Sequence, residues 1–142
     1  MKDLFRIDDD VAVVTGALGK LGPIWIETLL AAGATVFALD LPKAEISTGF
    51  EKLQNRFDPS RLVLDRADVR DRHSLEDACG RCLQTFGVPA ILVNNAGIDQ
   101  PPGKGAKGYL LEDIPFEIKR EIFEVNTLGL FLVSQVFGRH MV

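Results

Sequence analysis

A short apolar strand followed at once by a glycine-rich turn constrains this chain more than any other feature. Residues Val11–Thr15 read VAVVT, a β-branched run that predicts a buried parallel strand. Gly16, Gly19 and Gly22 follow within the next seven residues, and a helical pattern then runs from Leu21 to about Ala32. A strand, a tight turn and a helix in this order predict the first unit of an α/β fold.

The same alternation continues along the rest of the chain. Further strands are expected at 35–39, 61–67 and 90–93, and further helices at 44–56, 74–86 and from about 114 towards 140. Strands joined by helices through short turns form a parallel sheet with helices on both faces. Right-handed crossovers predict a doubly wound sheet with its first four strands in the order 3-2-1-4. We expect residues 1–142 to form one domain that lacks the C-terminal strands of such a sheet.

Composition and charge narrow the possible partners. Hydrophobic residues make up 46% of the 142 residues, which is enough to build a core. The net charge is −4 and the basic residues are scattered, so we expect no nucleic-acid partner. The N-terminus lacks the apolar segment of a signal peptide, and no apolar run reaches the ~18–20 residues that span a bilayer. We therefore expect no membrane partner and a cytoplasmic location.

Two cysteines, Cys79 and Cys82, form a C-x-x-C pair that is compatible with a redox site, half a zinc site or core packing. Together with Leu75 and Phe86 they recur at helical spacing, and the sequence holds no further cysteine. Buried free cysteine behaves as a small hydrophobic residue. The pattern favours core packing, and we expect no metal site.

The glycine turn also suggests a ligand. Glycines at these positions let the backbone approach a pyrophosphate, and the following helix offers unpaired N–H groups and the positive end of its dipole. Asp40 ends the second predicted strand, 24 residues after Gly16. A carboxylate there can accept hydrogen bonds from the ribose hydroxyls of a dinucleotide and repels a 2′-phosphate. The sequence therefore predicts a dinucleotide site with a preference for NAD over NADP.

Polar and small residues follow the third and fourth predicted strands. Asp68 and Val69 come after the third strand, and Asn94–Gly97 (NNAG) come after the fourth. The carboxyl ends of parallel strands meet at one edge of the sheet, where ligands of open α/β folds bind. We expect these two segments to join the same site.

In order and spacing, five segments resemble the short-chain dehydrogenase/reductase family: TGALGKLG at 15–22, Asp40, Asp68-Val69, NNAG at 94–97 and Asn126 within VNTLGLF. The resemblance implies the N-terminal, NAD(P)-binding part of a Rossmann-type oxidoreductase that moves a hydride between a nicotinamide cofactor and a carbonyl or alcohol substrate. It implies a cofactor-binding role for Gly16, Gly19, Leu21 and Gly22 at the pyrophosphate, for Asp40 at the ribose, for Asp68 and Val69 at the adenine, and for Asn95, Ala96 and Gly97 near the nicotinamide ribose.

The glycine turn departs from the family's common T-G-x-x-x-G-x-G pattern. Lys20 stands where the middle glycine would be, and Gly19 precedes it. The resulting T-G-x-x-G-x-x-G spacing is similar to that of epimerase-like relatives. A nucleotide-sugar epimerase or dehydratase therefore remains an alternative, although NNAG argues against it. A lysine beside the phosphates would also soften the preference for NAD.

The second departure concerns catalysis. The family's chemistry, by resemblance, uses a Tyr-x-x-x-Lys pair with a preceding serine. The single tyrosine here is Tyr109, and Asp113 stands four residues later. Of the family's catalytic residues only Asn126 matches, and in the family this asparagine holds a water of the proton relay. We expect the chain alone to be inactive, and a non-catalytic dinucleotide-binding module is a further alternative.

The helix expected over residues 114–140 suggests a further partner. Its stretch LGLFLVSQVF, residues 128–137, is apolar nearly all round, so that one face can pack on the sheet while another still needs cover. The resemblance implies that this helix pairs with its copy in a homo-oligomer.

Overall fold

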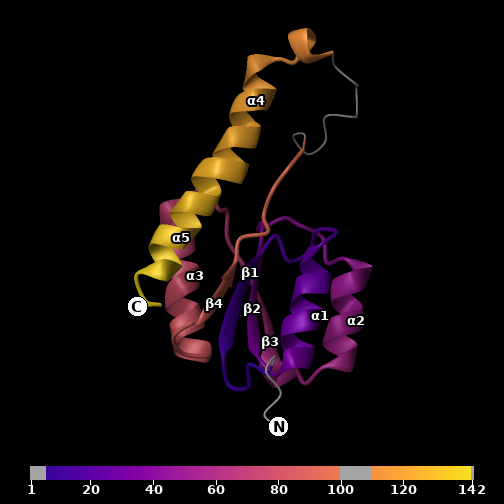
Figure 1. Cartoon of the computed structure of the whole chain (residues 1–142), viewed down its shortest axis with the longest axis vertical. Helices are drawn as coiled ribbons and strands as arrows, with labels where there is room; N and C mark the ends of the chain where they lie inside the picture. The colour runs from indigo at the N-terminus through magenta and orange to yellow at the C-terminus, as the bar shows by residue number, and fades with distance from the viewer. Residues whose placement is uncertain (1–5, 100–109, 142) are drawn as a thin grey trace.

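A computed structural model describes residues 6–99 and 110–141, and Figure 1 shows its four-stranded sheet between two layers of helices. The strands are β1 (Val11–Thr15), β2 (Thr35–Asp40), β3 (Leu62–Arg66) and β4 (Ile91–Val93). They pair in the order β3-β2-β1-β4, and every pair is parallel. The predicted fold class and strand order are confirmed.

Helices cover both faces of this sheet. One face packs on α1 (Gly22–Ala32) and α2 (Thr48–Arg56), and the other on α3 (Arg72–Thr85) and α5 (Leu130–Gly138). The helix α4 (Phe116–Phe123) precedes α5 and extends beyond the sheet. Short 3-10 turns lie at Pro59–Arg61 and Leu111–Asp113. No helix in the described ranges is long and apolar enough to cross a membrane.

Capping residues correct the predicted starts of two helices. The second helix begins at Thr48 rather than at residue 44, because the Ser47 side chain accepts a hydrogen bond from the Phe50 amide and caps it. The third begins at Arg72, two residues before the predicted start, because Asp71 accepts from the amides of His73 and Ser74. Capping side chains compete with helical hydrogen bonds, so they mark the end of a helix rather than its interior.

The sequence pattern predicts one long helix from about residue 114, but the structure divides this segment into two helices. A π-helical turn at Glu124–Gly129 separates α4 from α5. The extra residue of such a turn shifts the apolar faces of the two helices relative to each other, and π-helical turns are frequent at functional sites. The turn contains Asn126.

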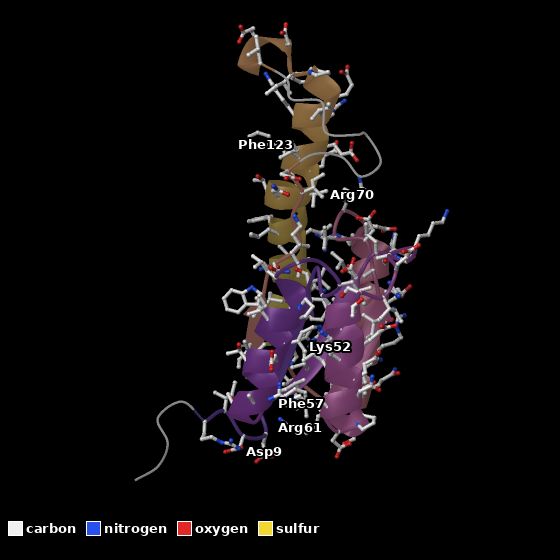
Figure 2. The ribbon with its side chains drawn as sticks, turned by 90° about the vertical axis from the view of Figure 1, so that its right-hand side faces the viewer. Asp9, Lys52, Phe57, Arg61, Arg70 and Phe123 are labelled. Atoms are coloured by element: carbon white, nitrogen blue, oxygen red, sulfur yellow. The ribbon has the colours of Figure 1, made fainter. Side chains whose placement is uncertain are left out.

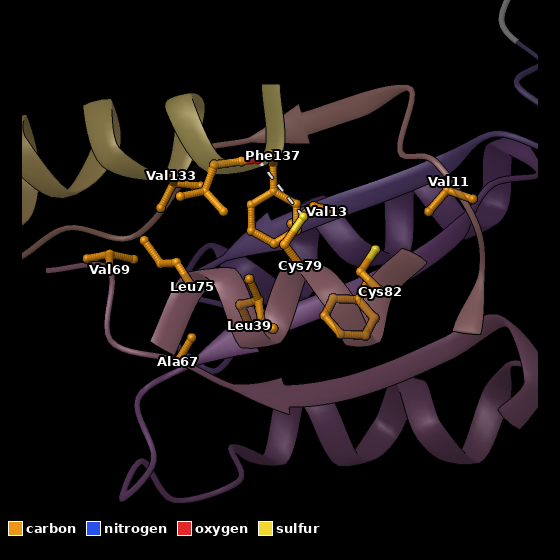
Figure 3. Packing of buried hydrophobic residues seen from close by; sticks show 13 residues of the cluster. Val11, Val13, Leu39, Ala67, Val69, Leu75, Cys79, Cys82, Val133 and Phe137 are labelled. Atoms are coloured by element: carbon orange, nitrogen blue, oxygen red, sulfur yellow. Dashed lines mark hydrogen bonds between the residues drawn. The ribbon is translucent and has the colours of Figure 1, made fainter. Parts of the chain in front are cut away.

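Both cysteines pack in the core on the α3 side of the sheet, as predicted (Figure 3). Cys79 and Cys82 are free thiols among Leu75, Val133 and Phe137. Burial raises the pKa of Cys82 to about 12, so that this thiol stays protonated and unreactive at neutral pH.

Candidate functional site

A cavity of about 790 Å³ opens at the carboxyl ends of the strands, where open α/β sheets bind their ligands. Ten of the eleven predicted site residues line it: Gly16, Gly19, Leu21, Asp40, Asp68, Val69, Asn95, Ala96, Gly97 and Asn126. The eleventh, Gly22, is not among the lining residues. Residues far apart in the sequence therefore meet around one cavity, as the sequence predicted.

Gly16 and Gly22 are required by contacts within the protein itself. Gly16 has a φ of 65°, and a Cβ there would lie 2.8 Å from the Cα of Ala96. A Cβ on Gly22 would lie 2.4 Å from the carbonyl oxygen of Ala17. Both distances are too short for a side chain to fit. These two glycines let the turn close against its neighbours and so shape the wall of the cavity.

The turn after β1 and the segment after β4 are joined through Thr15 and Asn95. The buried Thr15 hydroxyl accepts hydrogen bonds from the backbone amides of Asn95 (3.1 Å) and Ala96 (3.0 Å). In return, the Asn95 side-chain amide donates to the carbonyl oxygens of Thr15 (3.1 Å) and Gly16 (3.0 Å). Four hydrogen bonds thus fix the distance between two walls of the cavity before any ligand arrives.

Asp40 ties the end of β2 to the glycine turn. One carboxylate oxygen accepts from the backbone amide of Leu18 at 2.7 Å, and the other from that of Leu41 at 2.8 Å. Each oxygen of a carboxylate has two acceptor positions, so both keep one for a ligand. Asp40 therefore has a structural role in addition to the predicted ribose contact.

The first turn of α1 begins next to the cavity without a capping side chain. Its N-cap residue, Leu21, provides no side-chain cap, and no acidic residue lies in the first turn. Leu21 and the preceding Lys20 both line the cavity. An uncapped helix N-terminus beside a lysine attracts an anion.

Asp68 forms an ion pair with Arg70 in the loop between β3 and α3. The guanidinium lies 2.7 Å from one carboxylate oxygen, and both residues line the cavity. The hydrogen bonds from Arg70 hold the pKa of Asp68 below its usual value. Figure 2 shows Arg70 at the end of the molecule from which α4 projects. Asp68 is therefore ionised at neutral pH and can accept hydrogen bonds.

Asn126 bonds the segment after β4 to the π-helical turn. Its side-chain oxygen accepts from the Ile98 amide at 2.8 Å, and its side-chain nitrogen donates to the Ile98 carbonyl at 2.9 Å. The turn also packs closely on the loop after β3, because a Cβ on Gly129 would lie 2.8 Å from Cγ2 of Val69. The side chain of Asn126 is thus used to hold the cavity wall.

Sequence reasoning missed three residues that shape the cavity: Thr15, Arg70 and Ile98. The sequence predicts Thr15 as the end of a strand, and the structure shows that its buried hydroxyl also accepts hydrogen bonds from the segment after β4. Arg70 follows the Asp68-Val69 pair directly, and an arginine two residues after an aspartate was the available signal. Tyr109 lies outside the described residues.

Comparison with known proteins agrees with this geometry. The family profile described as short chain dehydrogenase matches residues 10–142. An NAD-dependent glycerol dehydrogenase of Listeria innocua is 30% identical over 97% of this chain and 50% of its own length. A galactitol 2-dehydrogenase of Rhizobium johnstonii is 34% identical, also over 97% of this chain and 50% of its own length.

A solved structure shares the fold. The putative short-chain dehydrogenase from Novosphingobium aromaticivorans superimposes with a TM-score of 0.80 at 23% identity, over 95% of this chain and 47% of that one. The chain spans about half the length of the curated relatives it matches.

Proposed function

The chain belongs to the short-chain dehydrogenase family, and on that premise we propose that residues 1–142 form the NAD-binding part of an oxidoreductase. The observation that carries the proposal is the single cavity lined by the glycine turn, Asp40, Asp68 and the 95–97 segment. When bound, the nicotinamide cofactor would accept or donate a hydride. Its substrate would be a small molecule with a carbonyl or alcohol group.

The donors and acceptors around the cavity fit a dinucleotide. The uncapped first turn of α1 and Lys20 suit a pyrophosphate, because both carry positive charge. Asp40 retains an acceptor position on each oxygen, which suits the two hydroxyls of a ribose. The close approach of Gly16 to Ala96 leaves the wall free of side-chain bulk at the pyrophosphate.

We propose NAD rather than NADP as the cofactor. Asp40 lies at the end of β2 and accepts hydrogen bonds from two backbone amides, which hold its carboxylate at the cavity. A 2′-phosphate would bring a second negative charge close to that carboxylate. Glu45 also lines the cavity and adds to its negative charge.

Asn126 is proposed to serve the site through its position in the π-helical turn. Each polar atom of its side chain makes one hydrogen bond to Ile98, so one acceptor position and one N–H remain for a water of a proton relay. The sequence holds no tyrosine with a lysine four residues later. We therefore propose that the general acid and base of hydride transfer come from residues outside this chain, and that residues 1–142 alone bind NAD without catalysis.

A second copy of the protein is the proposed partner of the α4–α5 arm, defined as residues 116–138. Four large side chains of the arm are at least 61% exposed: Phe116, Phe123, Leu128 and Phe131. Figure 2 shows Phe123 on the part of the arm that rises away from the sheet. Large apolar side chains that stay exposed on one arm suit an interaction site, and a two-fold dimer would cover them with the same arm of its copy.

Titration of the complete protein with NAD and NADP tests the cofactor assignment. Replacing Asp40 by Ala should weaken NAD binding by about 10- to 100-fold, the equivalent of one lost charge-assisted hydrogen bond. The preference for NAD over NADP should shrink at the same time. Asp77→Ala, which removes an exposed carboxylate of α3, is the matched control and should leave both affinities unchanged. Unaltered NAD binding by Asp40→Ala would show that Asp40 does not bind the ribose.

A further inference from the structure

Arg66, the last residue of β3, holds the turn that follows β2. Asp40 and Arg66 are partners in the parallel register of the two strands, so the arginine stands beside the start of this turn. Its Nη1 donates to the carbonyl oxygens of Leu41 at 2.9 Å and of Ala44 at 2.8 Å. The Ala44 amide also donates to the Leu41 carbonyl, at 3.1 Å, which closes a β-turn over residues 41–44. One guanidinium nitrogen therefore clamps both ends of the 41–44 turn.

The clamped turn forms part of the cavity wall. Leu41 and Ala44 line the cavity, as does Glu45 directly after the turn, whereas Arg66 does not. The Leu41 amide donates to Oδ1 of Asp40 at 2.8 Å, so a shift of the turn would also disturb a bond that orients this carboxylate. Arg66 thus acts on the cavity through the turn rather than by lining it.

Packing alone holds the turn weakly. Its central residues, Pro42 and Lys43, are exposed, whereas the half-buried Ala44 packs on the core of the α1 face. A guanidinium is a charged donor, and its hydrogen bonds are stronger than those between neutral groups. Removing it should therefore let the turn move away from the cavity.

We propose that Arg66 is a positioning residue that enforces the choice of NAD over NADP by clamping this turn. A 2′-phosphate needs room for a phosphoryl group beside Asp40, and a turn that is free to retreat would provide that room. With the clamp in place, a dinucleotide that carries the phosphate has to break the Arg66 bonds in order to bind. The inference rests on the proposed function, because it takes Asp40 and the turn as the walls around the adenosine ribose.

The charge of Arg66 by itself predicts the opposite effect, so the sign of the result is decisive. A guanidinium attracts a phosphate, and if Arg66 acted only as a cation, its removal would weaken NADP binding and increase the preference for NAD. If it acts as a clamp, its removal frees the turn and decreases that preference.

The test measures both dissociation constants on the complete protein, by calorimetric titration with NAD and by displacement of bound NAD with NADP. In Arg66→Gln the ratio of the NADP constant to the NAD constant should fall at least about fivefold, because two charge-assisted hydrogen bonds are lost. In Arg66→Lys, which keeps the charge and can still donate to the carbonyls, the ratio should fall by less. Arg66→Met has no donor and should match Arg66→Gln, and it decides the question if Arg66→Gln does not fold.

Arg61 supplies a matched control. Its Nη2 donates to the carbonyl oxygens of Leu30 and Ala34, each at 2.7 Å, at the C-terminal end of α1. It does not line the cavity, and Figure 2 shows it at the end of the molecule opposite to Arg70. Arg61→Gln removes the same kind of clamp and should lower the stability of the protein, yet it should keep the wild-type ratio.

The outcomes separate this inference from the function on which it rests. If the wild-type protein prefers NAD but Arg66→Gln and Arg66→Met keep or increase that preference, or if Arg61→Gln decreases it equally, the clamp is refuted and the NAD site stands. If the wild-type protein binds neither dinucleotide, or does not prefer NAD, the proposed function fails and the inference fails with it.

Discussion

The loop end of the sheet and the α4–α5 arm are held in opposite ways. At the loop end, which is the edge of the sheet where the strands reach their carboxyl ends, residues 15–22 and 94–98 are joined by backbone and side-chain hydrogen bonds. Glycines there allow close contacts that a Cβ would prevent. The arm is anchored at one end, where Val133, Val136 and Phe137 pack on α3, whereas its other end exposes Phe116 and Phe123. The conformation of the loop end is therefore fixed by contacts within the chain, whereas the exposed apolar side chains of the arm need another surface to bury them.

This contrast separates what the chain can do alone from what needs a partner. A cofactor cavity whose walls are already cross-linked loses little entropy when a ligand binds, which favours affinity. Exposed apolar side chains on the arm lower the solubility of the protein unless another surface packs on them. Four predictions test the contrast, in order of decreasing expected effect.

The glycine turn should tolerate no side chain at Gly16. Gly16→Ala combines a positive φ with a Cβ 2.8 Å from the Cα of Ala96, and should lower the free energy of unfolding by about 3 kcal/mol or more. Chemical denaturation of the complete protein measures it. Gly80→Ala is the control, because its Cβ would meet nothing within 4 Å in the middle of α3. That variant should be neutral or slightly stabilising. A Gly16→Ala protein as stable as the wild type would refute a preformed loop end.

The Thr15 hydroxyl should matter nearly as much. Thr15→Val keeps the shape of the side chain but removes the acceptor of two backbone amides, from Asn95 and Ala96. The Asn95 amide keeps its hydrogen bond to the Val93 carbonyl, so the Ala96 amide is the one that loses its acceptor. An unsatisfied buried group costs about 1–3 kcal/mol, and we expect a loss of that size in stability together with weaker NAD binding. Thr28→Val is the control, because that hydroxyl bonds within its own exposed helix at the Ile24 carbonyl. A loss no larger than that of the control would mean that the two walls are held by other contacts.

Substitutions on the arm should change the association of the protein with its copy rather than the stability of a single subunit. Phe123→Ser and Phe131→Ser replace exposed side chains, so each should change the stability of a single subunit by less than about 0.5 kcal/mol. Light scattering on the complete protein should nevertheless show a shift towards monomer at micromolar concentration. Val88→Ser, at another exposed apolar residue away from the arm, should leave the association unchanged. A wild-type protein that is itself a monomer would remove the basis for a self-associating arm.

Low pH should slightly reduce the contribution of the Asp68–Arg70 ion pair to the free energy of unfolding. The pKa of Asp68 is lower in the folded protein than in the unfolded chain, chiefly because Arg70 donates hydrogen bonds to it. Its contribution to stability is therefore present above the unfolded value of about 3.9 and is lost as the pH falls through the lower folded value. The stability difference between wild type and Arg70→Gln should be a few tenths of a kcal/mol at pH 7 and should disappear at low pH. Equal differences at pH 7 and pH 2.5 would contradict this.

The sequence by itself determined the layers, the strand order and ten of the 23 residues that line the cavity. Alternating apolar runs and helical patterns are local, and parallel strands can join them in few ways. Asp40 and the NNAG segment could be placed at the sheet edge because they follow strands whose ends meet there. The glycine turn could also be predicted from the sequence, because a strand precedes it and a helix follows it.

Only the tertiary structure decided how the site is held together. The Thr15–Asn95 bonds join residues 80 positions apart, and the Asn126–Ile98 pair joins residues 28 apart. The π-helical turn forms within an otherwise regular apolar pattern, where Gly129 approaches Val69 and the Asn126 side chain reaches Ile98. No local pattern encodes such contacts, because a side chain's partner depends on which distant segment folding places beside it.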